Sequence, residues 1–125
     1  MNNNVIKAIV TAVTGFLSSI LGILYVPVLL MVACNLIDYI TGLVAAKYRT
    51  DGGISSYKSM KGITKKVMMW LLVVVGAIID QVLAYASATL GFAMPFTFLV
   101  ACIVAIWIIC NEIISILENM LDIGV

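Results

Sequence analysis

Three acidic residues, Asp38, Asp80 and Glu112, lie inside stretches of the chain that are otherwise apolar enough to cross a membrane. A carboxylate near the centre of a bilayer costs about 2.5–3.5 kcal/mol on insertion scales, so such residues usually face a bundle interior or a water path. Little of the 125-residue chain remains outside these stretches. The sequence therefore predicts a protein that acts within the bilayer itself.

The overall composition also indicates an integral membrane protein. Hydrophobic residues make up 64% of the chain and charged residues 10%, whereas a soluble domain is about half apolar and about a quarter charged. The length suits about four spans of ~20 residues and leaves no room for a soluble catalytic domain. The chain has no histidine, and Cys34, Cys102 and Cys110 match no zinc or redox spacing. We therefore expect no enzyme, metal or cofactor.

We expect residues 1–125 to form a single domain. Turn residues divide it into four expected helices. Pro27 marks the first boundary, and residues 91–95 form a short uncharged turn before the last helix. Because no charged leader or cleavage site flanks the first apolar run, we expect the first helix to be retained. The predicted fold is all-α, two antiparallel helical hairpins, with helices at about 5–26, 27–48, 62–90 and 96–120 and a basic loop at 47–66.

The distribution of positive charge predicts the orientation. Six of the seven basic residues lie in the central loop, and the seventh is Lys7. The positive-inside rule places both regions in the cytoplasm, which fits four spans with both termini inside the cytoplasmic membrane of a bacterium. A first helix lying at the interface is the open alternative. The loop is expected to contact anionic lipids, not nucleic acid, through Lys47, Arg49, Lys58, Lys61, Lys65 and Lys66.

Basic and aromatic residues near the start of the expected third helix indicate contact with the lipid interface. Lys65 and Lys66 can extend from the base of the third helix to the lipid interface. Trp70 lies near the same boundary and is expected to act as an interfacial anchor.

Small and polar residues of the first helix fall on one stripe at about 100° per residue. Such residues let membrane helices approach closely. The stripe is predicted to be a helix-packing seam, or else a surface that later faces water in an oligomer. Its members are Thr11, Gly15, Ser18 and Gly22.

The later helices carry polar stripes at comparable depths. Asp38 lies ~12 Å from the cytoplasmic end of its helix, and Glu112 lies ~10 Å from Glu118, so the two carboxyls can meet across a helix interface. Asp80 lies ~20 Å beyond Lys66, and as a neutral carboxyl it can donate a hydrogen bond to a neighbouring helix. The predicted intramembrane network comprises Asn35, Asp38, Thr41, Asp80, Asn111, Glu112, Ser115, Glu118 and Asn119. These groups either hold helices together, line a polar pore or form a proton-sensitive switch.

The order of several short motifs resembles the phage lysis and toxin-secretion holin family. These motifs are Asp38-Tyr39-Ile40-Thr41-Gly42, then Ser55-Ser56, residues 58–62, Lys65-Lys66, Asp80 and the closing stretch 111–119. The resemblance covers about residues 35–119. It implies a homo-oligomer of the cytoplasmic membrane that opens lesions, through which a cytoplasmic endolysin or a large toxin leaves the cell. It assigns no catalytic residue and no pore lining.

Two other functions remain open at this point. A small ion or proton channel, or an accessory subunit of a transporter, would give selective and reversible conductance without passage of protein. A structural scaffold would give neither conductance nor lethality. No nucleophile–base pair is visible in the sequence, which disfavours an enzyme.

Overall fold

The computed structural model describes residues 2–49, 55–93 and 98–125, with only the backbone described at 17–21 and 23. Every regular element within these ranges is helical, as expected. The expected start of the last helix at 96 and the Asp51-Gly52-Gly53 centre of the basic loop lie outside the described residues. The elements are α1 (Asn3–Leu21), the 3₁₀ turn η1 (Gly22–Leu24), α2 (Tyr25–Ala46), α3 (Ser56–Leu90) and α4 (Leu99–Ile123).

Three of the described helices, α2, α3 and α4, are long and apolar enough to cross a membrane by length and composition. The all-α membrane fold is therefore confirmed. The expected first span, α1, has 19 residues, which is within the range of about 17–25 residues for a span. The side chains of residues 17–21 lie outside the described part of the chain, so a crossing by α1 stays a prediction. Asn4, Lys7, Thr11 and Thr14 make one face of this helix polar.

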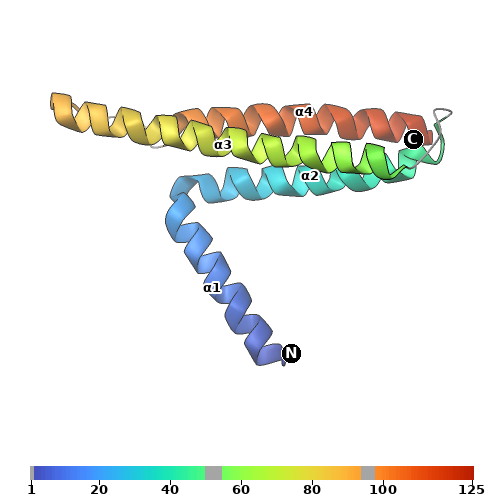
Figure 1. Ribbon diagram of the computed structural model, residues 1–125, viewed down its shortest axis with the longest axis horizontal. Helices are drawn as coiled ribbons and strands as arrows, with labels where there is room; N and C mark the ends of the chain where they lie inside the picture. The colour runs from blue at the N-terminus through green and yellow to red at the C-terminus, as the bar shows by residue number, and fades with distance from the viewer. Residues whose placement is uncertain (1, 50–54, 94–97) are drawn as a thin grey trace.

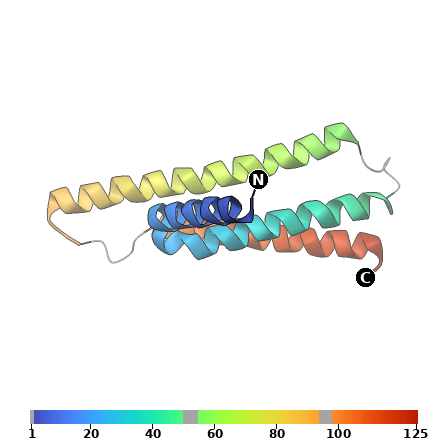
Figure 2. The same cartoon turned by 90° about the horizontal axis from the view of Figure 1, so that it is seen from below.

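The three long helices form an elongated bundle (Figure 1). α2 and α4 pack along each other, whereas α3 packs mainly against α4 and contacts α2 at few points. Figure 2 shows α3 diverging from the α2–α4 pair toward its N-terminal end. The buried apolar core lies between the helices and consists of Leu24, Met31, Val73, Ala101, Ala105 and Ile108.

The outer faces of the bundle are apolar. Leu71, Val74 and Ile78 of α3 and Ile103 and Ile106 of α4 are each about half exposed. A soluble monomer rarely exposes so extensive an apolar surface. These faces are suited to contact with lipid.

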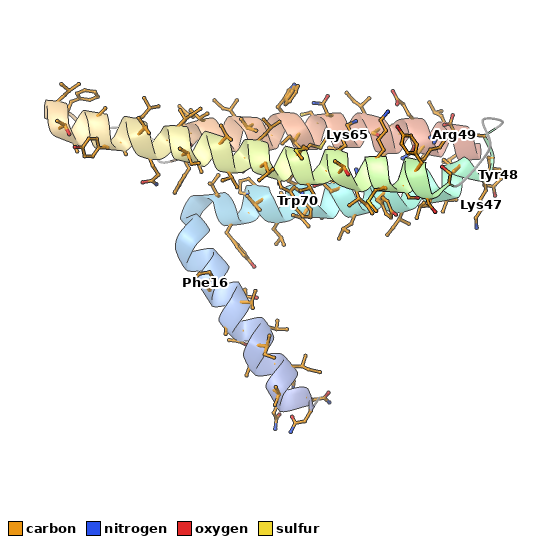
Figure 3. All side chains as sticks on the ribbon, in the orientation of Figure 1. Phe16, Lys47, Tyr48, Arg49, Lys65 and Trp70 are labelled. Carbon is orange, nitrogen blue, oxygen red and sulfur yellow. The ribbon has the colours of Figure 1, made fainter. Side chains whose placement is uncertain are left out.

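α1 leaves the bundle at a sharp turn and points away from the other helices (Figure 1). Gly22 makes this turn with a φ of +53°, a left-handed conformation that glycine adopts without the strain of a Cβ atom. The apolar face of α1 is open, with Val10 57% and Phe16 64% exposed. Phe16 lies on α1 apart from the bundle (Figure 3).

α3 begins earlier than the sequence predicts. Its first residue is Ser56, whereas the Lys- and Ser-rich stretch before residue 62 suggested a loop. The hydroxyl of Ser55 accepts a hydrogen bond from the backbone N–H of Lys58 at 3.1 Å. This N-cap satisfies one of the unpaired donors of the first turn and starts the helix inside the polar segment.

Candidate functional site

Lys66 connects three helices through two partly buried ion pairs. Its Nζ lies 2.7 Å from Asp38 Oδ2 on α2 and 2.7 Å from Glu112 Oε2 on α4. The Lys66 and Asp38 side chains are each 13% exposed, and the Glu112 side chain is 3% exposed. Asp38 and Glu112 therefore meet across the helix interface, as predicted, but through a shared cation from α3.

Asn35 and Trp70 extend this site away from the charged end of the bundle. Asn35, which is 1% exposed, donates from Nδ2 to Glu112 Oε2 at 2.9 Å. Trp70 Nε1 on α3 donates to Asn35 Oδ1 at 2.6 Å. Both polar atoms of the Asn35 amide therefore have a hydrogen-bond partner, Glu112 on α4 and Trp70 on α3.

Asn119 extends the site in the opposite direction. Its Nδ2 donates to Asp38 Oδ1 and to Thr41 Oγ1, each at 3.0 Å. Gly42 lies beside this amide, and a Cβ there would be in ordinary contact with the Asn119 nitrogen at 3.6 Å. Arg49 Nη2 donates to Asn119 Oδ1 at 2.8 Å, and Arg49 Nε pairs with Asp122 Oδ2 at 2.7 Å.

These contacts form one continuous polar network between apolar helices, from Trp70 through Asn35, Glu112, Lys66, Asp38 and Asn119 to Arg49. Among the described residues, every buried side-chain nitrogen or oxygen has a hydrogen-bond partner. Lipid offers no partner for such groups, so they remain stable only while the helices stay together. The network can therefore hold α3 to the α2–α4 pair, and its separation exposes charge.

Asp80 lies apart from this network and joins α3 to α4 in a different way. Its two carboxyl oxygens accept hydrogen bonds from the backbone N–H groups of Val100 and Ala101, each at 2.9 Å. Phe98, the N-cap residue of α4, has no capping side-chain hydrogen bond. Asp80 therefore caps α4 from a neighbouring helix, where a negative charge also suits the helix dipole. It accepts from α4 and does not donate to it, contrary to the role we expected from the sequence.

Gly76 makes this cap possible. It lies one turn before Asp80 on α3, and a Cβ at Gly76 would lie 3.0 Å from Ala101 Cα and 3.2 Å from Ala101 N. Ala101 is fully buried. The absence of a side chain at Gly76 lets the N-terminus of α4 approach α3 closely enough to reach the Asp80 carboxyl.

The structure divides the polar arc predicted for the last helix. Glu112 and Asn119 face the network, whereas Asn111 and Glu118 are exposed and Ser115 is half-buried. An arc of roughly 120° spans both the α2-facing and the outward-facing side of one helix. The predicted arc therefore combines a buried surface that faces the network with an exposed surface that faces away from it.

Lys66, Trp70, Arg49 and Asp122 are the network members that sequence reasoning missed or assigned to another role. The expectation that Lys66 extends to the lipid interface is wrong, because its ammonium group lies between two carboxylates inside the bundle. Lys66 and Trp70 are four residues apart, which puts them on one helical face. That spacing, together with two intramembrane carboxyls that lack a nearby cation on their own helices, was the sequence pattern that indicated a role for Lys66 inside the bundle.

Apart from Lys7 on α1, the remaining basic residues lie at the charged end of the bundle. Lys47 and Arg49 lie together at the end of α2, and Lys65 lies where α3 and α4 run side by side (Figure 3). Lys58, Lys61 and Lys65 are exposed and belong to α3, not to a loop.

The predicted seam on α1 makes no close packing contact at its described glycines. Thr11 and Gly15 are exposed, and a Cβ at Gly15 would meet no atom within 4 Å. Gly22 makes the turn into α2, and the side chain of Ser18 lies outside the described residues. Within one chain the seam is thus left open.

The fold and the site together define a helical membrane protein with a charged network buried between apolar spans. The chain belongs to the bacteriophage holin family, whose family model matches residues 15–125. The family resemblance predicted from the sequence is therefore confirmed.

Two curated relatives of the chain come from bacteria. The chain is 38% identical to the uncharacterized protein Lmo0128 of Listeria monocytogenes over 87 residues, which are 70% of this chain and 53% of that protein. It is 39% identical to the uncharacterized protein BH0965 of Halalkalibacterium halodurans over 83 residues, 66% of this chain and 56% of that protein. The match spans about half the length of these relatives. No solved structure matches the chain.

Proposed function

We propose that this protein is a holin that assembles with copies of itself in the cytoplasmic membrane and opens lesions large enough to release a cytoplasmic endolysin or a large toxin. In the closed assembly, the polar network and the open seam of α1 face protein. Opening moves α3 away from the α2–α4 pair and turns the freed polar groups toward water.

The observation that carries this proposal is the bridge from Lys66 to Asp38 and Glu112. A buried ion pair is weak evidence for stability as such, but separation of its members leaves uncompensated charges that lipid cannot satisfy. A water-lined opening can satisfy them. Helices joined by charge thus favour two states, one packed and one hydrated, over gradual separation in lipid.

The orientation proposed for the chain follows from its charge. The basic end of the bundle, with Lys47, Arg49 and the first turns of α3, faces the cytoplasm under the positive-inside rule. The network then lies toward the cytoplasmic side, and the Asp80 cap lies toward the outer side. Both termini are cytoplasmic if α1 crosses the membrane.

Inducible expression in a bacterium tests the proposal, with and without an endolysin that lacks its own export signal. We expect abrupt lysis only when both proteins are present, after a delay in which the membrane stays intact. Membrane abundance is measured in parallel by immunoblotting. No lysis at normal abundance contradicts the proposal.

A small ion or proton channel is the second candidate. Asn111 and Glu118 are polar residues exposed on the spanning helix α4, and several copies of such a face can line a narrow aqueous path. This candidate predicts depolarisation of the cell without release of the endolysin, and the same expression experiment separates the two functions.

A further inference from the structure

A basic cavity of about 250 Å³ lies at the charged end of the bundle, between α2, α3 and α4. Among the described residues that line it, four are cationic and one, Asp38, carries a carboxylate. Lys66 is engaged by Asp38 and Glu112, and Arg49 by Asp122, whereas Lys65 is exposed at the edge. The cationic side chains are Arg49, Lys58, Lys65 and Lys66, and the cavity also presents the hydroxyl groups of Ser55, Ser59 and Ser115.

The N-terminus of α3 opens into the same cavity. Ser55, Ser59 and Gly62 recur on one face of its first turns and line the cavity, and this first turn contains no acidic side chain. The positive end of the helix dipole therefore adds to the lysine charges. Chemically, the cavity suits a phosphate group.

An apolar groove of about 780 Å³ runs between α3 and α4 and meets the cavity. Lys65 and Ser115 line both spaces. Along α3 the groove extends from Lys65 to Val75, ~15 Å at 1.5 Å per residue. That length is about half of the ~30 Å hydrocarbon core, the depth of one leaflet. Its apolar lining includes Met68, Met69, Leu72, Val75, Trp107 and Ile108.

We propose that the cavity and the groove together bind one anionic phospholipid, with its phosphate beside Lys65 and an acyl chain between α3 and α4. A free phosphate would use only the cavity and would leave the adjoining groove unexplained. Glu118 also lines the groove, and its charge disfavours a second anion there, so the phosphate is expected on the cavity side of Lys65. This inference does not depend on lesion formation.

Native mass spectrometry of the detergent-purified full chain tests the proposal. The protein is incubated with equal amounts of phosphatidylglycerol and phosphatidylcholine that carry identical acyl chains, with and without inorganic phosphate. We expect preferential retention of phosphatidylglycerol that phosphate does not displace. Lys65→Gln should lower this retention about fivefold, the effect of one lysine charge near an anionic surface.

Three variants distinguish binding at this site from a general attraction of anionic lipid to the basic end of the bundle. Lys61→Gln removes the same charge four residues earlier on α3, from a lysine that lines neither space, and should leave retention unchanged. Leu72→Trp fills the groove and should lower retention of the lipid. Met68→Trp is a second groove-filling variant. Both parent side chains are about half exposed, and circular dichroism checks the helical content of each variant.

Four results would overturn the inference. Equal retention of both lipids would show that the protein does not recognise the charge of the headgroup. An equal loss of retention in Lys61→Gln and Lys65→Gln would show a diffuse attraction to the basic end of the bundle instead of a site. Displacement of the lipid by inorganic phosphate identifies a free anion as the occupant. A change of oligomer mass in Leu72→Trp with lipid retention unaltered assigns the groove to a second copy of the chain.

Discussion

Lys66 carries more of the structure than its neighbours in sequence, because its single charge is shared between two carboxylates on different helices. Removing one member of a buried ion pair costs about 3–5 kcal/mol, since the remaining charge stays buried without a partner. The exposed Arg49–Asp122 pair contrasts with it: its side chains are 34% and 45% exposed, and such pairs contribute about 0–1 kcal/mol. The two ion pairs therefore differ in importance despite equal distances.

Lys66→Met should lower the free energy of unfolding by about 3–5 kcal/mol, because Asp38 and Glu112 then face each other without a cation. Denaturant unfolding in detergent, followed by the fluorescence of Trp70 and Trp107, measures the loss. Lys61→Met, an exposed lysine on the same helix, should change stability by no more than about 0.5 kcal/mol. The triple variant Asp38→Asn, Lys66→Met and Glu112→Gln should recover most of the loss. Equal stability of Lys66→Met and Lys61→Met contradicts this assignment.

The same carboxylates should set the time of lysis if the proposed function holds. Asp38→Leu and Glu112→Met each keep the approximate size of the side chain but remove its charge, which changes the balance between the packed and the hydrated state. We expect lysis to be advanced, delayed or abolished in an endolysin-coupled assay. Thr64→Val, a change at an exposed residue of α3, is the matched control. Unchanged timing at equal membrane abundance would remove both carboxylates from the mechanism.

At the scale of helices, α3 is attached to the bundle at two different places. Asp80 and Gly76 fix it to the start of α4 by a backbone cap and a close approach, whereas Lys66 and Trp70 attach its other half through side chains alone. In Figure 2, α3 diverges from the other two helices toward its N-terminal half, which contains Lys66 and Trp70. The two halves of α3 are therefore attached by different kinds of contact, backbone hydrogen bonds at the Asp80 end and ion pairs at the Lys66 end.

Asp80→Ala should loosen the start of α4, because the Val100 and Ala101 N–H groups lose their acceptor. The expected cost is about 1–2 kcal/mol, as for loss of a helix N-cap. Hydrogen exchange should increase at the beginning of α4 and remain slow around Glu112. Gln81→Ala, at the exposed adjacent position, should leave both regions protected. Uniformly faster exchange along α4 would show that Asp80 stabilises the whole bundle and not this cap.

At the scale of the molecule, hydrophobicity was sufficient to predict α2, α3 and α4, since long apolar runs have few alternatives to helices in lipid. The four-residue spacing of Lys66 and Trp70 indicated a shared face of α3, but it could not identify Lys66 as the partner of both carboxylates, because this depends on how α3 lies across two other helices. The Asp80 cap could not be predicted either, because its partners are backbone N–H groups, which every residue except proline carries. The placement of α1 depends on what covers its polar face, which a single chain does not contain.

Cysteine labelling decides whether α1 spans the membrane. In a chain with Cys34, Cys102 and Cys110 replaced by alanine, a single cysteine is placed at Asn3 or at Val125. If α1 spans, with its polar face covered by another copy, both termini are cytoplasmic. We therefore expect a membrane-impermeant maleimide to label neither cysteine in intact cells and both after permeabilisation.

A different labelling pattern is expected if α1 does not cross the membrane. If α1 lies on the outer surface, the cysteine at Asn3 reacts in intact cells and the one at Val125 does not, which rejects the four-span orientation. Labelling must precede any lesion, so an exposed thiol on a cytoplasmic protein is monitored as the leakage control. α1 exposes both its apolar face and Thr11 in the isolated chain, so a spanning α1 has a small-residue face free to pack against another helix. Protection of Asn3 would therefore support the four-span topology.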